Sequence, residues 1–313
     1  MLIAGIDIGS NAARLYFSNV FEHEGEIIVE KASLVRIPVR LGEDVFNDGY
    51  ISKSKIDNLV KTLSAYKLLI EVYEPVVYKA VATAAMREAI NNKEVVSYVF
   101  EKTGIEIEII DGIKEANMVC AVHNFANIEK ERVMMFVDVG GGSTEISLNQ
   151  GERIIDSASF RIGTIRMLKD KVEQKEWDRL KQWLKPYRKN PTPIICIGSG
   201  GNINKIAKLY GDRNDSYIPY ETLVFSNQHL SSFNLEERIE DLGLRPDRAD
   251  VIIPAARIYI NVLKWSNIDK IYVPKIGLSD GIVYNLYKEF KSKNVVPAKN
   301  ERGTIQSWLE DLE

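Results

Sequence analysis

The sequence predicts an α/β protein of two related domains, and three observations support this fold class. The chain has 313 residues, 45% of them hydrophobic, which is enough for two domains with separate cores. Two segments, IAGIDIGS at 3–10 and MFVDVGGGS at 135–143, both join an apolar strand-like run to Asp-x-Gly. Helical spacing of apolar residues alternates with short apolar runs after each segment. A repeat one domain apart indicates duplicated sheets that open with similar hairpins.

Three strand-like segments open the first domain, and helices alternate with strands after them. Ser52 is expected to cap a helix that Pro75 ends, because a proline disfavours the helical conformation of the residue before it. Hydrophobic spacing then predicts a strand at 76–83, a helix at 91–103, a strand at 105–110 and a helix at 114–127.

The second half shows the same alternation. The spacing predicts helices at 163–170, 174–187, 202–209 and 248–265, and strands at 192–197 and 269–273. A final helix near 281–291 is expected to pack back on the first domain. We therefore expect domains at 1–127 and 128–280, a tight hinge near 128–132, and a polar tail at 293–313.

Composition and charge exclude several classes of protein. The net charge of −3 and the pI of about 5.9 give no electrostatic reason to expect nucleic acid as a partner. No segment has the basic start of a signal peptide or the length of a membrane span, which predicts a cytoplasmic protein. Cys120 and Cys196 lie in apolar runs and are expected to be reduced. The histidines lack zinc-ligand spacing, so a metal here would be a hard cation held by carboxylates.

The segment DVGGGSTE at 138–145 is the strongest chemical signal. Successive glycines let a backbone approach a ligand closely and turn its N–H groups toward phosphate oxygens. Asp138 and Glu145 supply carboxylates for a magnesium ion on the same phosphates, while Ser143 and Thr144 supply hydroxyl donors. A plain hairpin turn whose glycines have positive φ is the alternative interpretation. The matching segment DIGSN at 7–11 favours a ligand site, because two facing loops form a cleft.

Three further features are weaker signals. The segment IGSGGN at 197–202 follows a strand and opens a helix, so Gly200 and Gly201 could bind a phosphate; a tight turn is the alternative. It has neither the Gly-Lys-Ser/Thr of a P-loop nor the third glycine of the dinucleotide fingerprint. Arg87 could clamp a phosphate or lie solvated on a helix surface. Glu115 could act on water or only favour a helix dipole.

In their order and spacing, these motifs resemble those of the exopolyphosphatase/guanosine pentaphosphate phosphohydrolase (Ppx/GppA) family, in a short two-domain form. The likeness covers about residues 2–291 and rests on DIGSNAARL, RLGEDV, ATAAMREA, DGIKEA, DVGGGSTE, RIGTIR, IGSGGNI, RADVIIPA and GLSDGIV. The family is a branch of the acetate and sugar kinase, Hsp70 and actin superfamily. The resemblance therefore implies two actin-like, ribonuclease H-like domains with a cleft between them.

The resemblance also implies a role for each residue of the site. Glu115 matches the glutamate that acts as the base on water. Asp138 and Glu145 match carboxylates linked to the metal, and Asp7 is a further metal candidate. The implied phosphate contacts are Ser10, Asn11, Arg87, Gly140, Gly141, Gly142, Ser143, Gly200 and Gly201. Mg²⁺ is the implied cofactor, with Mn²⁺ as the alternative.

The sequence departs from the family pattern at Ala12, Ala84 and Ser279. Each departure removes a hydroxyl or a charge near the implied cleft, which predicts a difference in substrate preference or rate. The chain also stops where longer members continue into a helical domain, so we expect a shorter track for a long polymer.

The leading functional hypothesis is an exopolyphosphatase, which removes terminal orthophosphate from inorganic polyphosphate by in-line attack of water. Hydrolysis of guanosine pentaphosphate is the close alternative, since the sequence shows no firm nucleobase pocket. A phosphotransferase and a non-catalytic sensor that binds alarmone or polyphosphate are the other interpretations. Relatives that dimerise make a homodimer a candidate assembly, and neither a membrane nor nucleic acid is expected as a partner.

Overall fold

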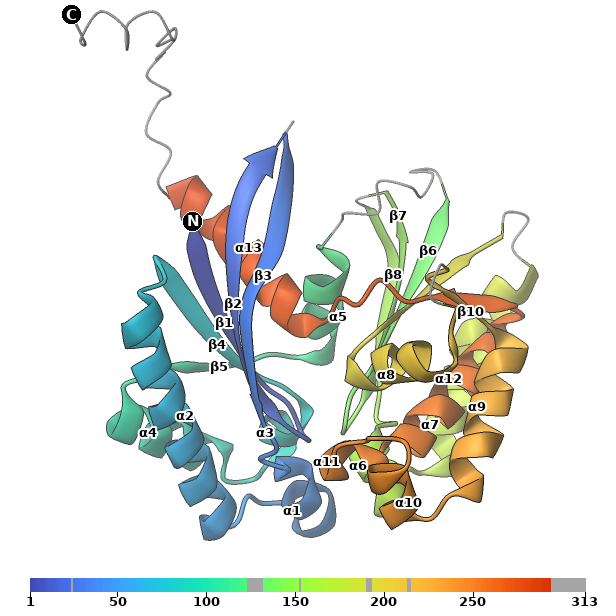
Figure 1. Cartoon of the computed structure of the whole chain (residues 1–313), viewed down its shortest axis with the longest axis horizontal. Helices are drawn as coiled ribbons and strands as arrows, with labels where there is room; N and C mark the ends of the chain where they lie inside the picture. Colours follow the sequence, from blue (N-terminus) through green and yellow to red (C-terminus); the bar gives the residue numbers. More distant parts are fainter. Residues whose placement is uncertain (24, 123–131, 152, 190–192, 213–214, 294–313) are drawn as a thin grey trace, which may run out of the picture.

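The chain forms two mixed sheets, one of five strands and one of six, with helices packed on their faces (Figure 1). The structure, a computed structural model, describes residues 1–23, 25–122, 132–151, 153–189, 193–212 and 215–293. The predicted α/β class and the predicted duplication of sheets are confirmed. Within the described ranges, no helix combines the length and the apolar character needed to cross a bilayer.

The first sheet has the strand order β3-β2-β1-β4-β5. Its strands are β1 (Leu2–Ile8), β2 (Ala13–His23), β3 (Glu26–Ile37), β4 (Val77–Ala82) and β5 (Ile107–Ile109). The helices that accompany it are α1 (Leu41–Asp48), α2 (Lys53–Tyr73), α3 (Ala84–Glu88), α4 (Asn92–Thr103) and α5 (Gly112–Cys120). Ser52 caps α2 as predicted, because its side chain accepts a hydrogen bond from the backbone N–H of Lys55.

The second sheet has the strand order β10-β11-β9-β6-β7-β8. Its strands are β6 (Val133–Val139), β7 (Thr144–Gln150), β8 (Arg153–Phe160), β9 (Ile195–Ser199), β10 (Tyr217–Pro219) and β11 (Lys270–Tyr272). The helices that follow β6 along the chain are α6 (Thr164–Leu168), α7 (Gln174–Leu184), the 3₁₀ helix η1 (Lys185–Lys189), α8 (Gly201–Tyr210), α9 (Tyr220–Ser232), α10 (Leu235–Glu240), α11 (Pro246–Ala249) and α12 (Ile252–Ser266), and last α13 (Leu278–Lys293), which packs on the first sheet.

The two sheets repeat one pattern around a central strand. β6 pairs antiparallel with β7 and parallel with β9, just as β1 pairs with β2 and β4. In register, Asp7 lies opposite Arg14, and Asp138 lies opposite Glu145. The repeat in the sequence therefore places one aspartate at the same end of the central strand in each sheet.

The last described helix, α13, returns to the first sheet. Its residues Val283, Leu286 and Tyr287 pack with Ile3 and Val20, and Figure 1 shows the helix running beside β1 and β2. For description, we call β1–β5 with α1–α5 and α13 the first lobe, and β6–β11 with α6–α12 the second lobe. The predicted domain limits stay a prediction, because the hinge near 128–132 and most of the tail at 293–313 lie outside the described residues.

Two predicted helices have different limits in the structure. The helix expected at 114–127 is α5, which ends at Cys120, and residues 123–127 lie outside the described ranges. The helix expected at 248–265 is divided into α11 and α12.

Three helices, α1, α9 and α10, are absent from the sequence-based prediction. α9 buries only Leu223, Ser226 and Leu230, and α10 buries no residue, so neither has a clear apolar period. α1 begins after Arg40, whose left-handed φ of 48° is unusual before a helix. Rules based on hydrophobic spacing do not detect a helix with a weak apolar periodicity, or one that begins after a residue in the left-handed conformation.

Gly281 tests the packing of α13 on the first lobe. A Cβ at this position would lie 2.1 Å from the backbone oxygen of Met118 in α5. We therefore expect Gly281→Ala to lower the free energy of unfolding by about 1–3 kcal/mol, although alanine is the better helix former. Urea titration followed by circular dichroism measures this change. Gly277→Ala is the matched control, because a Cβ there meets open space; a Gly281→Ala protein as stable as its parent would contradict the packing.

Candidate active site

A cavity of about 960 Å³ lies between the lobes, and both sequence repeats contribute to its lining. From the first lobe it is lined by Asp7, Ser10, Asn11 and Glu115. From the second lobe it is lined by Asp138, Gly140, Gly141, Gly200 and Gly201. The structure thus brings together most of the residues that the sequence nominated. Arg87, Gly142, Ser143 and Glu145 are not part of this lining among the described residues.

The two repeated loops touch each other at the base of the cavity. Each loop closes with the same hydrogen bond, from Gly9 N to Ala12 O at 3.0 Å and from Gly140 N to Ser143 O at 2.9 Å. A Cβ on Gly141 would lie 2.9 Å from the Cβ of Ser10. The two loops are therefore in direct contact, as a facing pair requires.

Close approach, and not positive φ, is what requires glycine in the triple-glycine turn. None of Gly140, Gly141 and Gly142 has a positive φ. A Cβ on Gly142 would lie 2.3 Å from Cζ of Phe46 and 2.8 Å from the Cβ of Ala84. Both neighbours belong to the first lobe, so side chains on this turn would separate the lobes.

The triple-glycine turn beside the cavity has backbone donors without a backbone partner. The carbonyl of Gly141 accepts hydrogen bonds from Ile165 N at 2.9 Å and Arg166 N at 3.2 Å. Within the described ranges, the N–H groups of Gly141 and Gly142 have no backbone acceptor. Free N–H groups in a turn form a site that suits an anion. Thr144 does not contribute as expected, because its hydroxyl donates to Ile162 O at 2.6 Å.

Three carboxylates, those of Glu115, Asp138 and Glu145, converge beside this turn. One oxygen of each lies within 4.8 Å of an oxygen of the other two. Ser199 donates to Asp138 Oδ1 at 2.7 Å, and Ser159 donates to Glu145 Oε1 at 2.8 Å. In the part of the chain that the structure describes, Glu115 Oε2 and Glu145 Oε2 have no hydrogen-bond partner.

Burial raises the pKa values of all three carboxylates. Burial raises the pKa of Glu145 to about 7, and the Asp138 carboxylate contributes to the same shift. Burial, and next the charge of Glu145, raise the pKa of Glu115 well above its usual value. Burial also raises the pKa of Asp138. A divalent cation would relieve both the burial and the repulsion, so these residues fit a hard metal ion.

Asp7 and Asp138 occupy equivalent strand positions, but Asp7 is paired with a cationic side chain and, among the described residues, Asp138 is not. The Arg14 guanidinium donates to Asp7 Oδ2 and forms an ion pair with it. Asp7 lines the cavity but is not one of the three converging carboxylates. Its predicted role as a metal ligand stays a prediction.

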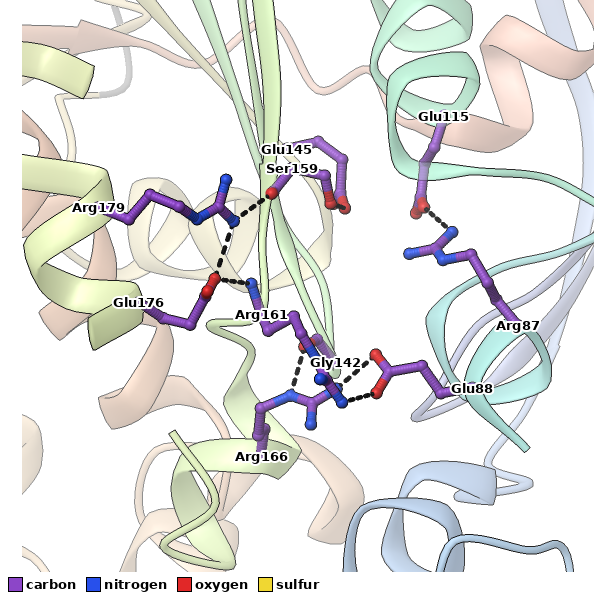
Figure 2. A network of polar contacts seen from close by, with 10 residues as sticks. All are labelled: Arg87, Glu88, Glu115, Gly142, Glu145, Ser159, Arg161, Arg166, Glu176 and Arg179. Atoms are coloured by element: carbon purple, nitrogen blue, oxygen red, sulfur yellow. Dashed lines mark hydrogen bonds and ion pairs between the residues drawn. The ribbon is translucent and has the colours of Figure 1, made fainter. Parts of the chain in front are cut away.

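Arg87 and Glu115 lie together on the first-lobe side, across from Glu145 (Figure 2). Arg87 Nη1 donates to Ile110 O at 2.7 Å and lies 3.5 Å from Glu115 Oε2. Arg87 is the last-turn cation of the short helix α3, directly after β4, as the sequence predicted. Its guanidinium therefore faces the carboxylate group, and its predicted contact with phosphate stays a prediction.

The remaining predicted phosphate contacts lie at the cavity wall. Gly200 has φ of +99°, and a Cβ there would lie 3.0 Å from Asp138 Oδ1. Gly201 begins α8, so its N–H points out of a ten-residue helix at the end that favours anions. Asn11 Nδ2 donates to Asp247 O at 2.9 Å. Within the described chain, Ser10 Oγ has no hydrogen-bond partner.

The sequence analysis assigned no role to three arginines that line the cavity, Arg14, Arg36 and Arg248. Arg36 Nη2 lies 2.5 Å from Asp247 Oδ2. Burial, and next the charges of Arg36 and Arg14, lower the pKa of Arg248 to about 10. Such crowding of positive charge favours an anion in the cavity. The sequence could have identified Arg14 from its register opposite Asp7. This register becomes visible only when the pairing of β1 with β2 is known.

Comparison with known proteins finds one family and several relatives. A sequence model of the Ppx/GppA phosphatase family matches residues 26–290. The bifunctional 3-dehydroquinate synthase/phosphatase of Fusobacterium nucleatum is 29% identical over 87% of this chain and 44% of that protein. Guanosine-5'-triphosphate,3'-diphosphate pyrophosphatase of Photobacterium profundum is 25% identical over 94% and 61%. Exopolyphosphatase 1 of Mycobacterium tuberculosis is 24% identical over 90% and 87%. The chain thus spans less than two thirds of the first two relatives.

Solved structures agree with the family match. The Ppx/GppA family member of Aquifex aeolicus is 25% identical, with a TM-score of 0.72 over 93% of this chain and 98% of that one. The agreement covers both lobes, because the matched share includes nearly the whole chain.

The metal-binding interpretation makes a prediction about Glu145. Glu145→Gln keeps the size of the side chain but removes one of the three charges, so we expect divalent affinity to fall at least about tenfold. Titration calorimetry with Mg²⁺ and Mn²⁺ measures this affinity. Glu108→Gln is the matched control, because Glu108 pairs with Lys79 and Lys114 away from the cavity. Equal affinity of parent and Glu145→Gln would remove Glu145 from the metal site.

Proposed function

This chain belongs to the Ppx/GppA phosphatase family, and from that membership we propose that it is an exopolyphosphatase dependent on Mg²⁺. The reaction is hydrolysis of the terminal phosphoanhydride bond of inorganic polyphosphate. The observation that carries this proposal is the group of three carboxylates, two buried and that of Asp138 half-buried, beside a glycine turn whose N–H groups have no backbone acceptor in the described chain, next to a cavity lined by arginines. A cytoplasmic location and a homodimer are part of the same proposal.

Glu115 is the proposed base. Its carboxylate takes a proton from a water molecule whose oxygen forms a bond to the terminal phosphorus. The bond from that phosphorus to the bridging oxygen breaks, which releases orthophosphate and a chain shorter by one phosphate. The position of Glu115 supports this role, because its carboxylate lines the cavity and lies 3.5 Å from the Arg87 guanidinium, which keeps it at the edge of the proposed phosphate site.

Asp138 and Glu145 are the proposed residues that hold the metal, with Asp7 as a further candidate. When bound, a divalent cation supplies positive charge that offsets the charge on the phosphate oxygens. Ser199 and Ser159 support this role, because their hydroxyls hold one oxygen of each carboxylate and leave the other oxygen available.

The terminal phosphate is proposed to lie against the N–H groups of Gly141, Gly142 and Gly201. The hydroxyl groups of Ser10 and Ser143, the backbone at Gly140 and Gly200, and the side chains of Asn11 and Arg87 complete its proposed contacts. Backbone donors and a guanidinium aimed at the reacting group stabilise the charge of a phosphoryl transition state.

Arg14, Arg36 and Arg248 are proposed to bind the phosphates that follow the terminal one. The lowered pKa of Arg248, caused by burial and next by the charges of Arg36 and Arg14, supports this, since phosphates bound there would offset the positive charge around Arg248. Hydrolysis of guanosine pentaphosphate remains the second candidate. It is supported by the apolar part of the cavity at Ala207, Ile218 and Val273, where a base has room to lie.

Glu115→Gln tests the base. Because the amide cannot take a proton from water, we expect kcat to fall by about 10² to 10⁴ while the protein stays folded. Phosphate release from short polyphosphates in the presence of Mg²⁺ measures this, with Glu108→Gln as the control of equal charge. A variant that releases phosphate at the parental rate would exclude Glu115 as the base. Tight polyphosphate binding by a parent protein without turnover would instead favour a sensor.

Arg248→Gln tests the extended phosphate site. Removing one charged donor is expected to lower kcat/KM for polyphosphate about tenfold, since hydrogen bonds to charged groups contribute roughly 1.5–3 kcal/mol. Arg257→Gln in α12 is the matched control, because Arg257 is exposed outside the cavity. Kinetics on polyphosphate and guanosine pentaphosphate, measured side by side, show which substrate depends on Arg248. Unchanged kinetics on both would exclude it from binding.

A further inference from the structure

One carboxylate of the first lobe binds two guanidinium groups of the second. Glu88 is the last residue of α3, and its Oε1 accepts from Arg166 Nη2 at 2.6 Å. Its Oε2 accepts from Arg161 Nη2. Figure 2 shows both contacts. We call Glu88, Arg161 and Arg166 the Glu88 bridge.

Arg166 is the buried member of this bridge. Its side chain is only 5% exposed, and its Nε donates to Gly142 O at 2.9 Å. Its guanidinium carbon lies 4.1 Å from the centre of the Phe46 ring in α1. A single side chain from the second lobe thus contacts α1, α3 and the triple-glycine turn. A planar guanidinium with this many directed contacts has little freedom to move.

The first-lobe end of the bridge is joined to the candidate site through α3. Arg87 directly precedes Glu88 in this five-residue helix, and Arg87 N donates to Thr83 O at 2.9 Å. A displacement of Glu88 would therefore move Arg87 and its contact with Glu115.

The second-lobe end of the bridge is joined to Glu145 through β8. Glu176 accepts from Arg161 N at 2.9 Å and from Arg179 Nη2 at 2.8 Å. Arg179 also donates to Ser159 O at 2.6 Å, and the Ser159 hydroxyl holds Glu145. The same chain of contacts thus extends from α3 to one of the three carboxylates (Figure 2).

Two other ion pairs join the lobes on a different side. Arg36 pairs with Asp247 at 2.5 Å and Arg40 pairs with Asp250 at 2.7 Å, so β3 and the start of α1 are tied to the region of α11. Neither pair includes α3 or the triple-glycine turn. Among the ion pairs between lobes that the structure describes, the Glu88 bridge is the one that includes α3 and contacts the triple-glycine turn.

We propose that Glu88 and Arg166 are positioning residues, which align Arg87 and Glu115 in the first lobe with the glycine turn and Glu145 in the second. This rests on the proposed hydrolysis. Neither side chain lines the cavity in the described structure, so both act through their neighbours. Their loss removes no contact with the substrate. It disturbs an alignment needed in the transition state, so the effect falls on kcat and much less on KM.

Kinetics of Glu88→Gln, Arg166→Lys and the double variant test this proposal. We expect each single change to lower kcat at least tenfold with KM within threefold, because a misplacement of about 1 Å can cost about 10² in rate. We expect the double variant to be within threefold of the worse single variant, since the two residues act as one unit. Glu108→Gln, which breaks ion pairs within one lobe, is expected to stay within twofold of the parent.

A purely structural bridge predicts a different result. In that case Glu88→Gln lowers the melting temperature, while kcat per folded molecule stays within twofold of the parent, and this result would overturn the proposal. If Arg166→Lys does not fold, Glu88→Gln and Glu88→Asp are sufficient to test the positioning role. Glu88→Asp keeps the charge but shortens the reach, so its kcat is expected between those of Glu88→Gln and the parent.

A distance measurement separates this proposal from the proposed function. Spin labels at Lys61→Cys in α2 and Lys181→Cys in α7, both exposed positions, report the separation of the lobes. We expect one narrow distance distribution in the parent and a broader one after Glu88→Gln. An unchanged distribution would contradict the positioning role. If the parent released no phosphate from any substrate, the proposed function would fail, and the label distances would still decide the role of the bridge.

Discussion

Three carboxylates gathered between two lobes, with Glu115 and Glu145 buried and Asp138 half-buried, set the main constraint on this structure. At separations up to 4.8 Å, each pair of charges repels by roughly 3.5 kcal/mol or more at an effective dielectric constant of about 20. Burial is the largest cause of the raised pKa values of Glu115, Asp138 and Glu145, and the hydroxyl and guanidinium groups around these carboxylates offset it only in part. A divalent cation and the N–H groups of the glycine turn together suit this negative charge.

The two sheets surround their equivalent aspartates with different charges. At the equivalent strand position, the first lobe has Arg14 opposite Asp7, whereas the second lobe has Glu145 opposite Asp138. The first lobe therefore neutralises its aspartate internally, and the second lobe concentrates negative charge. Because of this difference, the second lobe is suited to binding a metal and the first lobe supplies cationic contacts. The proposed hydrolysis therefore depends on how the two lobes are aligned.

Much of the fold was predictable because local patterns determine it. The repeated Asp-x-Gly segments, the cap at Ser52 and the glycine loops all follow from short-range rules, and the motifs placed the main residues of the candidate site. The bridge from Glu88 to Arg166 was not predictable, because these residues are far apart in sequence and meet only when the lobes pack. The same applies to the Arg14, Arg36 and Arg248 lining. Weakly amphipathic α9 and α10 were missed because their apolar faces are narrow.

The position of a bound metal decides whether Asp138 and Glu145 hold it. Crystals grown with Mn²⁺ and a short polyphosphate analogue would locate the ion by its anomalous scattering. We expect a peak about 2.0–2.2 Å from oxygens of both Asp138 and Glu145, with a phosphate against Gly141 and with Glu115 facing the outer side of that phosphate. An ion bound elsewhere in the cavity, with these carboxylates protonated and paired to each other, would contradict this expectation.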